Sequence, residues 1–536
     1  MAELHATEII VLLLALVAAL TVLARRLGLP YPILMTVAGL ALGLVLGLVP
    51  DLPRVELPPD IVFLVFLPPV LFSAAYFTSP RELRVNARPI ALLAFGLVLV
   101  TTVVVGLVVH ALVPEMGWAP AFALGAIVSP PDAVAATAIA QRLGMPRRVV
   151  TILEGESLVN DSTALVALRL AVAAVVGGTF SLVEAAGSFV VVSIGGVAIG
   201  LAIGWALVQI EKRLNDPPVE VLVSLLGPFI AWIAAESIEV SGVLAVVTAG
   251  LVLGQAAPRV MSSDSRVLGS GVWQMMIFVI NGLVFTLIGL QLPTILDALS
   301  ARWQPGELAL LGAAVSMAVI GARLAWVFPA TYLPRLLWPG LRQRDRNPPA
   351  RIVFVIGWAG MRGVVSLAAA LALPLTLEGG SQPFPFRDLL LFLTFAVILA
   401  TLVGQGLTLP WLIRKLGIGD DGSTQHDEVH AREAAMVAAL ERLDSLAHEW
   451  PDHMELIDQM RARYEHSAEH LEHSHETDAP ELAPDQEQIE HGRIQQALLD
   501  AQRVAVIDLR DRGVIGDEAL RRVERDLDLE ELRAEG

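Results

Sequence analysis

The sequence predicts an all-α polytopic membrane protein with about 13 transmembrane helices and a helical tail. Three observations predict this class. Hydrophobic residues make up 55% of the 536 positions and gather in about thirteen runs long enough to cross a bilayer. Two of these runs are interrupted by proline or glycine beside a charged residue. Almost all of the net charge of −17 falls after about residue 417, which predicts a separate, water-exposed region.

The apolar runs give the order of the membrane helices. The first run follows a segment without the basic residues of a secretory signal, so we expect it to be an uncleaved span. The runs lie near 7–25, 31–49, 60–77, 88–113, 119–141, 149–176, 183–210, 219–238, 241–257, 272–293, 307–331, 350–374 and 386–413.

Lys and Arg concentrate in every second connection between these runs, for example at 81–88, 142–148 and 335–351. Such an asymmetry orients a membrane protein with the positive connections inside. We therefore expect a multi-pass protein of the plasma (inner) membrane, surrounded by the lipid bilayer. Its N-terminus would lie outside and its acidic tail in the cytoplasm.

The fifth and twelfth runs are predicted to be broken helices. The fifth contains Ser129-Pro130-Pro131-Asp132, in which two prolines remove two backbone donors. The twelfth contains the glycine-rich segment 357–363 around Arg362. Broken helices are tolerated within a bilayer only where protein or a water-filled cavity covers them. A pair of interrupted spans, one in each half, is typical of an inverted-repeat transporter with its site near the midplane.

The sixth run carries the densest polar segment, residues 154–161, where hydrocarbon would otherwise surround the chain. Ionisable residues inside a membrane usually mark an ion or proton path. On a helix Ser157 and Asp161 share one face, and Glu156 and Asn160 share the neighbouring one. One face is therefore available for an ion while the other is held by a partner.

These residues have the oxygen atoms that a hard cation prefers. Asp161, Asp132, Ser157 and the carbonyls freed at Ser129 and Pro130 are the candidate ligands for a transported monovalent cation such as Na⁺. A buried carboxylate also takes up a proton readily. Cation and H⁺ would then compete for Asp161, and that competition is itself an exchange mechanism. Asn160 adds a ligand for the ion or for the backbone, but no proton.

Buried arginines are expected to balance the remaining acids. We predict a structural ion pair between Glu156 and Arg362, because guanidinium and carboxylate pair bidentately. Arg323 would either neutralise Asp132 or stabilise a helix end. For Glu154 two roles stay open, an entry funnel for the ion or a second ion pair.

The segment Gly155-Glu156-Ser157-Leu158-Val159-Asn160-Asp161 resembles the signature of monovalent cation/proton antiporters, in the NhaP-type branch that includes animal sodium/hydrogen exchangers. Further matching segments lie at 241–245, 281–285 and 360–363, in the expected order, and the resemblance extends to about Leu416. It implies an inverted-repeat antiporter fold with two discontinuous crossing helices, in a homodimer. Within residues 1–416, spans near 88–176 and 307–413 would form the moving core, and the remainder would form the interface.

The resemblance also implies roles for individual residues. Asp161 would carry the ion and the proton, with Asp132, Ser157 and Asn160 around it, and an Asn-Asp pair implies electroneutral one-for-one exchange. This chain departs from the family pattern at Pro131 and Ala133, where relatives often have Thr and Pro. Ser129 is then the candidate for the missing hydroxyl ligand.

The leading hypothesis for function is Na⁺/H⁺ antiport by alternating access, with Li⁺ as a further candidate cation. The alternatives are a K⁺/H⁺ antiporter of the same fold and a cation channel gated by the tail. An enzyme is not expected, and neither is a cofactor or a nucleic-acid partner. Residues 417–536 are predicted to be an acidic, helical, regulatory module in the cytoplasm.

Overall fold

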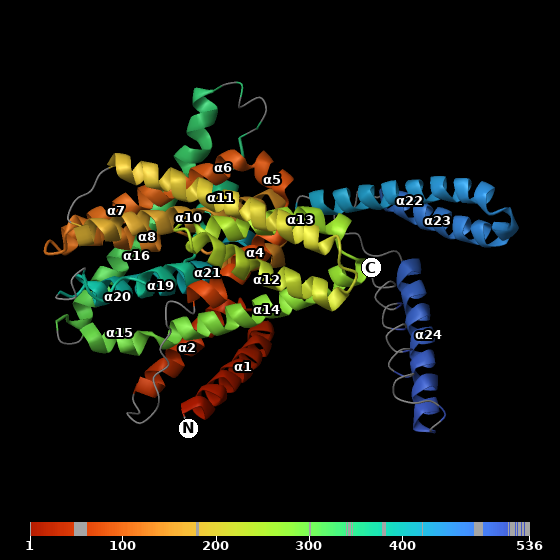
Figure 1. The fold of residues 1–536 in the computed structure, drawn as a ribbon, viewed down its shortest axis with the longest axis horizontal. Coiled ribbons are helices and arrows are strands. Elements are labelled where there is room, and N and C mark those ends of the chain that lie inside the picture. The colour runs from red at the N-terminus through yellow and green to blue at the C-terminus, as the bar shows by residue number, and fades with distance from the viewer. Residues whose placement is uncertain are drawn as a thin grey trace. The chain divides into compact units, whose positions relative to one another are not determined.

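The structure, a computed structural model, is built almost entirely of helices (Figure 1). It describes residues 2–47, 62–177, 182–299, 302–338, 347–377, 382–420, 422–475 and 486–512, together with Gly340, Asp345 and single residues beyond 512. The chain forms two compact units, Met1–Ser423 and Thr424–Gly536.

The first unit confirms the predicted fold class. Among the described residues, nine helices are long and apolar enough to cross a membrane, and three shorter apolar helices accompany them. The main helices of these nine spans are α1 (Ala2–Leu27), α7 (Val98–Leu112), α10 (Arg147–Gly177), α11 (Leu182–Glu211), α12 (Pro217–Glu236), α13 (Gly242–Val260), α14 (Ser263–Leu290), α16 (Pro305–Leu337) and α20 (Arg387–Leu399). Further elements include α2 (Tyr31–Gly47), α4 (Leu67–Phe77), α5 (Pro80–Val85), α6 (Ala87–Ala91), α15 (Leu292–Leu299) and α21 (Gly406–Lys415).

Two spans are broken, as predicted. The fifth run forms α8 (Trp118–Val128) and α9 (Ala133–Arg142), separated by the Pro-Pro segment. The twelfth forms α18 (Ala350–Trp358) and α19 (Val364–Leu371), separated by residues 359–363. Proline at 130 and 131 cannot donate the backbone hydrogen bonds that would continue α8, so the helix ends there.

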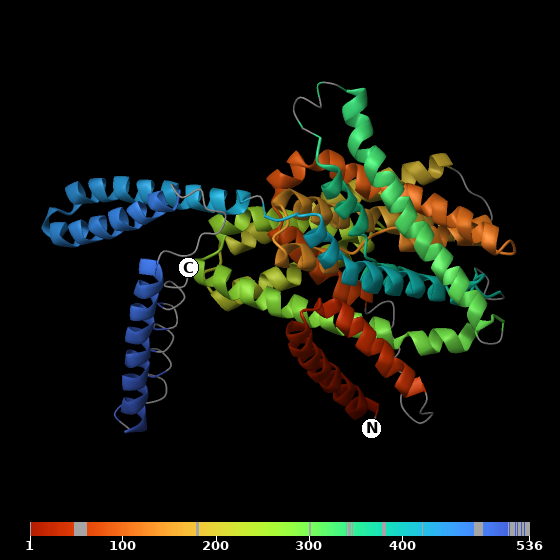
Figure 2. The ribbon, with the colours of Figure 1, turned by 180° about the vertical axis from the view of Figure 1, so that it is seen from behind.

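The helices of this unit pack around two apolar clusters. One is centred on α8, α10, α16 and α20, and the other on α4, α11, α12 and α13. In both views α14 runs beside α2 and α1 (Figures 1 and 2). Close approach depends on glycine: a Cβ at Gly200 of α11 would meet the backbone of Ala245 in α13. The outer face of α11 exposes large apolar side chains, among them Val191, Ile194 and Trp205, as expected of a helix that faces lipid.

The second unit contains α22 (Ser423–Glu449), α23 (Met454–His475) and α24 (Gln486–Asp511). Leu443 of α22 and Ile457 of α23 are buried, and Arg461 pairs with Asp444 at 2.6 Å across the two helices. The contact boundary at 423/424 lies slightly beyond the change in composition near residue 417. The tail therefore has a small core of its own, and its regulatory role stays a prediction.

Asp345, between α16 and α18, connects three helices of the first unit. Its carboxylate accepts from Arg88 at 2.8 Å, Arg148 at 3.0 Å and Arg335 at 2.7 Å. Burial opposes ionisation of this carboxyl. The hydrogen bond from Arg148 and the charges of the three arginines outweigh that effect, so the pKa of Asp345 lies below its usual 3.8.

We expect Asp345→Asn to lower the free energy of unfolding by about 1–3 kcal/mol at neutral pH, because charge-assisted hydrogen bonds are lost. A carboxyl with a lowered pKa in the folded state stabilises the protein above its unfolded pKa, and this contribution is lost as the pH falls through the folded pKa. The difference in melting temperature between wild type and variant should therefore stay constant from about pH 8 to about pH 5. A difference that already shrinks across that range would contradict this assignment.

Candidate functional site

The two helix breaks are in direct contact with each other. The backbone N–H of Asp132 donates to the carbonyl of Met361 at 2.7 Å, which joins the break of α8 and α9 to that of α18 and α19. The backbone N–H of Arg362 donates to the Thr401 hydroxyl at 3.0 Å. Backbone groups freed by the breaks are thus paired with each other and with side chains, as the interior of a membrane requires.

Asp132 lies where two half-helices begin. It is the N-cap of α9, and its Oδ1 accepts from the backbone N–H of Val134 at 2.8 Å. The backbone N–H of Val364, the first residue of α19, also hydrogen-bonds to this carboxylate. The N-terminus of a helix carries a partial positive charge and stabilises an anion. Two such termini therefore offset part of the cost of burying a charge on the Asp132 side chain.

Gly363 allows this arrangement because it has no side chain. A Cβ built on Gly363 would overlap the Asp132 carboxylate, including Oδ2. The glycine-rich segment of the twelfth run is thus needed for close approach of the second break to the acid of the first.

We expect Gly363→Ala to abolish or strongly reduce transport while the protein still folds, because the added methyl displaces the Asp132 carboxylate from the cavity. Gly321→Ala is the matched control, since a Cβ at Gly321 would meet no described atom within 4 Å. Transport by reconstituted protein and gel-filtration profiles of both variants test this expectation. Wild-type transport by Gly363→Ala would contradict it.

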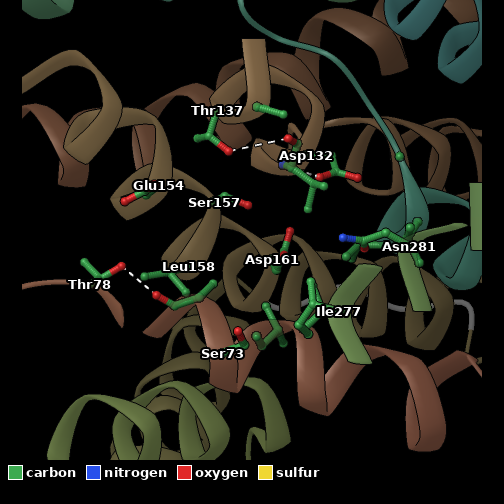
Figure 3. A pocket seen from close by; sticks show the side chains of 18 of the residues that line it. Ser73, Thr78, Asp132, Thr137, Glu154, Ser157, Leu158, Asp161, Ile277 and Asn281 are labelled. Atoms are coloured by element: carbon green, nitrogen blue, oxygen red, sulfur yellow. Dashed lines mark hydrogen bonds between the residues drawn. The ribbon is translucent and has the colours of Figure 1, made fainter. Parts of the chain in front are cut away.

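The central cavity, as we call it, is a hollow of about 550 Å³ whose lining includes residues of both breaks, α10 and α14. Ser157 and Asp161 project into it from one face of α10, as their spacing predicts. Figure 3 shows Asp161, Ser157, Asp132 and Asn281 arranged around the same space. Asp161 is 3% exposed, so its carboxylate is shielded from bulk water within the protein.

Toward the predicted cytoplasmic end of α10 the central cavity reaches partly exposed side chains, and we call this end its mouth. Its lining there includes Glu82, Gln141, Arg147 and Thr151. Glu82 forms an ion pair with Arg147 and accepts a hydrogen bond from Thr151 at 2.8 Å.

Beyond Asp161, toward the opposite end of α10, the helix is held against α12 and α13. The Ser162 and Ser241 hydroxyls lie 3.0 Å apart, and Arg169 pairs with Glu236 at 3.1 Å. The cavity around Asp161 thus extends toward one end of α10. At the other end, polar contacts join α10 to α12 and α13.

Two of the expected ligands do not line this cavity. The Ser129 hydroxyl donates to the carbonyl of Ala126 at 2.9 Å, and the Ser129 carbonyl accepts from Arg362 at 3.4 Å. Asn160 is fully buried on another face of α10, and neither atom of its amide has a hydrogen-bond partner among the described residues. In this conformation the cavity therefore brings together Asp161, Asp132 and Ser157 without Ser129 or Asn160.

The expected Glu156–Arg362 ion pair is wrong. Glu156 pairs instead with Arg323 of α16 through two hydrogen bonds, one of them 2.8 Å between Nη2 and Oε2. The two side chains are 1% and 0% exposed. Arg323 also donates to the carbonyl of Ile356 in the last turn of α18, one of the two roles expected of it, but it does not pair with Asp132.

Arg362 is bound by carbonyl groups of the breaks. Its guanidinium donates to Val128 at 3.0 Å, to Ser129 and to Gly360. These carbonyls have lost their helical partners because α8 and α18 stop there. The physical reason for the different pairing is that Arg362 satisfies the free carbonyl ends, while Arg323, from an unbroken helix, reaches the carboxylate of Glu156.

Asn281, in the segment 281–285 that resembles the family pattern, is a cavity residue that was not among the expected ligands. Its side chain hydrogen-bonds to Tyr31. It is also part of the cavity lining, on the side of α14 that faces Asp161 (Figure 3). Its position in a short polar interruption of an apolar run, 281–282, was the available signal.

The sequence and the fold both match known proteins. The sequence model described as "Sodium/hydrogen exchanger, transmembrane" matches residues 11–415. An uncharacterized Na⁺/H⁺ exchanger of Mycobacterium tuberculosis is 36% identical over 98% of this chain and 96% of its own length. A sodium, potassium, lithium and rubidium/H⁺ antiporter of Bacillus pumilus is 33% identical over 78% of this chain and 63% of its own length. The sodium proton antiporter MjNhaP1 of Methanocaldococcus jannaschii matches in structure with a TM-score of 0.61 at 18% identity, covering 78% of this chain and 99% of that one.

Proposed function

Because this chain belongs to the sodium/hydrogen exchanger family, whose members are transporters and not enzymes, we propose that it exchanges Na⁺ for H⁺ across the plasma membrane. The observation that carries this proposal is the pair of carboxylates, Asp161 and Asp132, in one buried cavity where two broken helices meet. Oxygen ligands from these residues and from Ser157 suit a hard monovalent cation.

Exchange follows from competition for Asp161. Two carboxylates in one shielded cavity repel each other, and either a cation or a proton removes that repulsion. The half-helix N-termini stabilise the charge of Asp132, which leaves Asp161 as the group that alternates between H⁺ and Na⁺. When the core moves between its two openings, Asp161 carries whichever partner it holds.

A stoichiometry of one Na⁺ for one H⁺ follows from the same assignment. Asn160, beside Asp161, has no proton to exchange, and we assign the exchanged proton to Asp161 alone. Exchange is then electroneutral and independent of the membrane potential. The arginine-rich connections support a membrane orientation with the N-terminus outside and the tail in the cytoplasm. We further propose a homodimer, in keeping with the family resemblance.

K⁺ is a second candidate for the transported cation. The Bacillus pumilus relative is named for sodium, potassium, lithium and rubidium, and it shares 33% of its aligned residues with this chain. K⁺ in place of Na⁺, or beside it, is therefore the alternative, because oxygen ligands by themselves do not set the size of the ion.

The test is transport by purified protein in lipid vesicles with an imposed pH gradient and a clamped membrane potential. Na⁺, Li⁺ and K⁺ are added in turn, and collapse of the gradient is followed with a pH-sensitive dye. Collapse with Na⁺ supports the proposal, and collapse with K⁺ only would support the alternative. Cation movement that follows the membrane potential and is not coupled to protons would contradict antiport and indicate a channel.

A further inference from the structure

Glu154 is the acidic residue of α10 that the exchange mechanism does not use. Its side chain lines the central cavity on the same helix as Ser157 and Asp161 (Figure 3). It is partly buried. No described residue forms a hydrogen bond or an ion pair with its carboxylate, which distinguishes it from Glu82 nearby.

The spacing of Glu154 places it in line with the ion ligands. Glu154, Ser157 and Asp161 follow at intervals of three and four residues, so they occupy one face of the helix. All three line the same cavity. Glu154 is one turn from Ser157 and about 10 Å along the helix axis from Asp161, at a rise of 1.5 Å per residue.

Among the described acids at the mouth, Glu154 is the one whose carboxylate has no hydrogen bond or ion pair. Glu82 is engaged by Arg147 and Thr151, so much of its charge is balanced. Glu82 and Glu154 both line this part of the cavity. Arg147, the cation of the lining, is paired with Glu82, so the charge left in the lining is that of the acids. A cavity with an excess of one sign of charge concentrates counter-ions.

We propose that Glu154 is an entry site that captures the incoming cation and passes it to Ser157 and Asp161. This inference rests on the proposed function and assigns a residue for cation capture within it. Glu154 is a positioning residue that raises the local cation concentration, and it does not carry the proton. Of the two roles left open by the sequence, the structure favours the entry funnel, because the second ion pair is absent among the described residues.

The test is the split between KM and maximal rate in reconstituted vesicles. Glu154→Gln keeps the shape of the side chain and removes the charge. We expect the KM for Na⁺ to rise about ten- to twentyfold, as one charge at about 10 Å would produce at the effective dielectric constant of a protein surface, with an unchanged maximal rate. Glu154→Asp, which retains the charge, should restore a KM close to wild type. Glu115→Gln, which removes an exposed acid paired with Arg302, is the matched control and should leave the KM unchanged.

The dependence of the KM on ionic strength is a second test. A purely structural role of Glu154 would not change this dependence. Added choline chloride should raise the wild-type KM by screening Glu154, and it should have less effect on Glu154→Gln. An unchanged KM in Glu154→Gln, or a lower maximal rate at constant KM, would overturn the inference. Failure of the proposed function is separate, since it would appear as wild-type protein that does not collapse the pH gradient when Na⁺ is added.

Discussion

Asp161→Asn is expected to reduce cation-dependent proton movement to the level of protein-free vesicles. The substitution keeps the size of the side chain and removes both the negative charge and the exchangeable proton. Asp161 is 3% exposed and lines the central cavity beside Asp132 and Ser157. Of the other acids in the lining, Asp132 is held at the N-termini of α9 and α19, Glu82 is paired with Arg147, and Glu154 lies about two turns away on α10.

The measurement is dye-reported collapse of a pH gradient on addition of Na⁺, with the orientation and amount of protein matched between preparations. Glu115→Gln removes the same charge from an exposed position and serves as the control. The melting temperature of Asp161→Asn should equal or exceed that of wild type, because an amide replaces a shielded charge. Residual Na⁺-dependent exchange above background would remove Asp161 from the mechanism.

The second large effect is expected for Glu156→Gln. The substitution leaves the Arg323 guanidinium buried without its carboxylate partner. Removing one partner of a buried ion pair lowers the free energy of unfolding by about 3–5 kcal/mol. Because Glu156 and Arg323 connect α10 to α16, and Arg323 also holds the end of α18, we expect loss of the folded protein together with loss of transport.

Thermal unfolding in detergent tests this expectation, with Glu115→Gln as a matched control that breaks an exposed pair. The control should cost no more than about 1 kcal/mol. A double variant, Glu156→Leu with Arg323→Met, removes both charges and should recover part of the lost stability. Equal melting temperatures for Glu156→Gln and wild type would show that the pair does not brace the helices.

The sequence correctly predicts those features of the site that depend on residues close together in the chain. Within one helix, spacing fixes which side chains share a face, so the interval of four residues is enough to place Ser157 and Asp161 together. The two prolines at 130 and 131 and the glycines of 357–363 mark the breaks for the same reason, since backbone geometry is a property of the residues themselves.

The partners of buried charges could not be predicted this way. Arg323 and Arg362 are both arginines within apolar runs, and the sequence does not show which of them reaches Glu156. The choice depends on where the carbonyl ends of α8 and α18 lie in space, because those ends bind Arg362 and leave Glu156 to Arg323. The role of Asn281 likewise depends on how α14 is rotated against α10.

The sequence by itself determined the membrane class, the order of the spans, the two breaks and the polar face of the sixth span. These features follow from apolar length, backbone chemistry and helical period, which act between residues close in the chain. Only the tertiary structure decided which acids share a cavity, which arginine balances Glu156, and that Glu154 faces the path to Asp161 without an ion-pair partner in the described residues. Contacts between distant segments depend on how helices pack, and packing is a property of the whole fold.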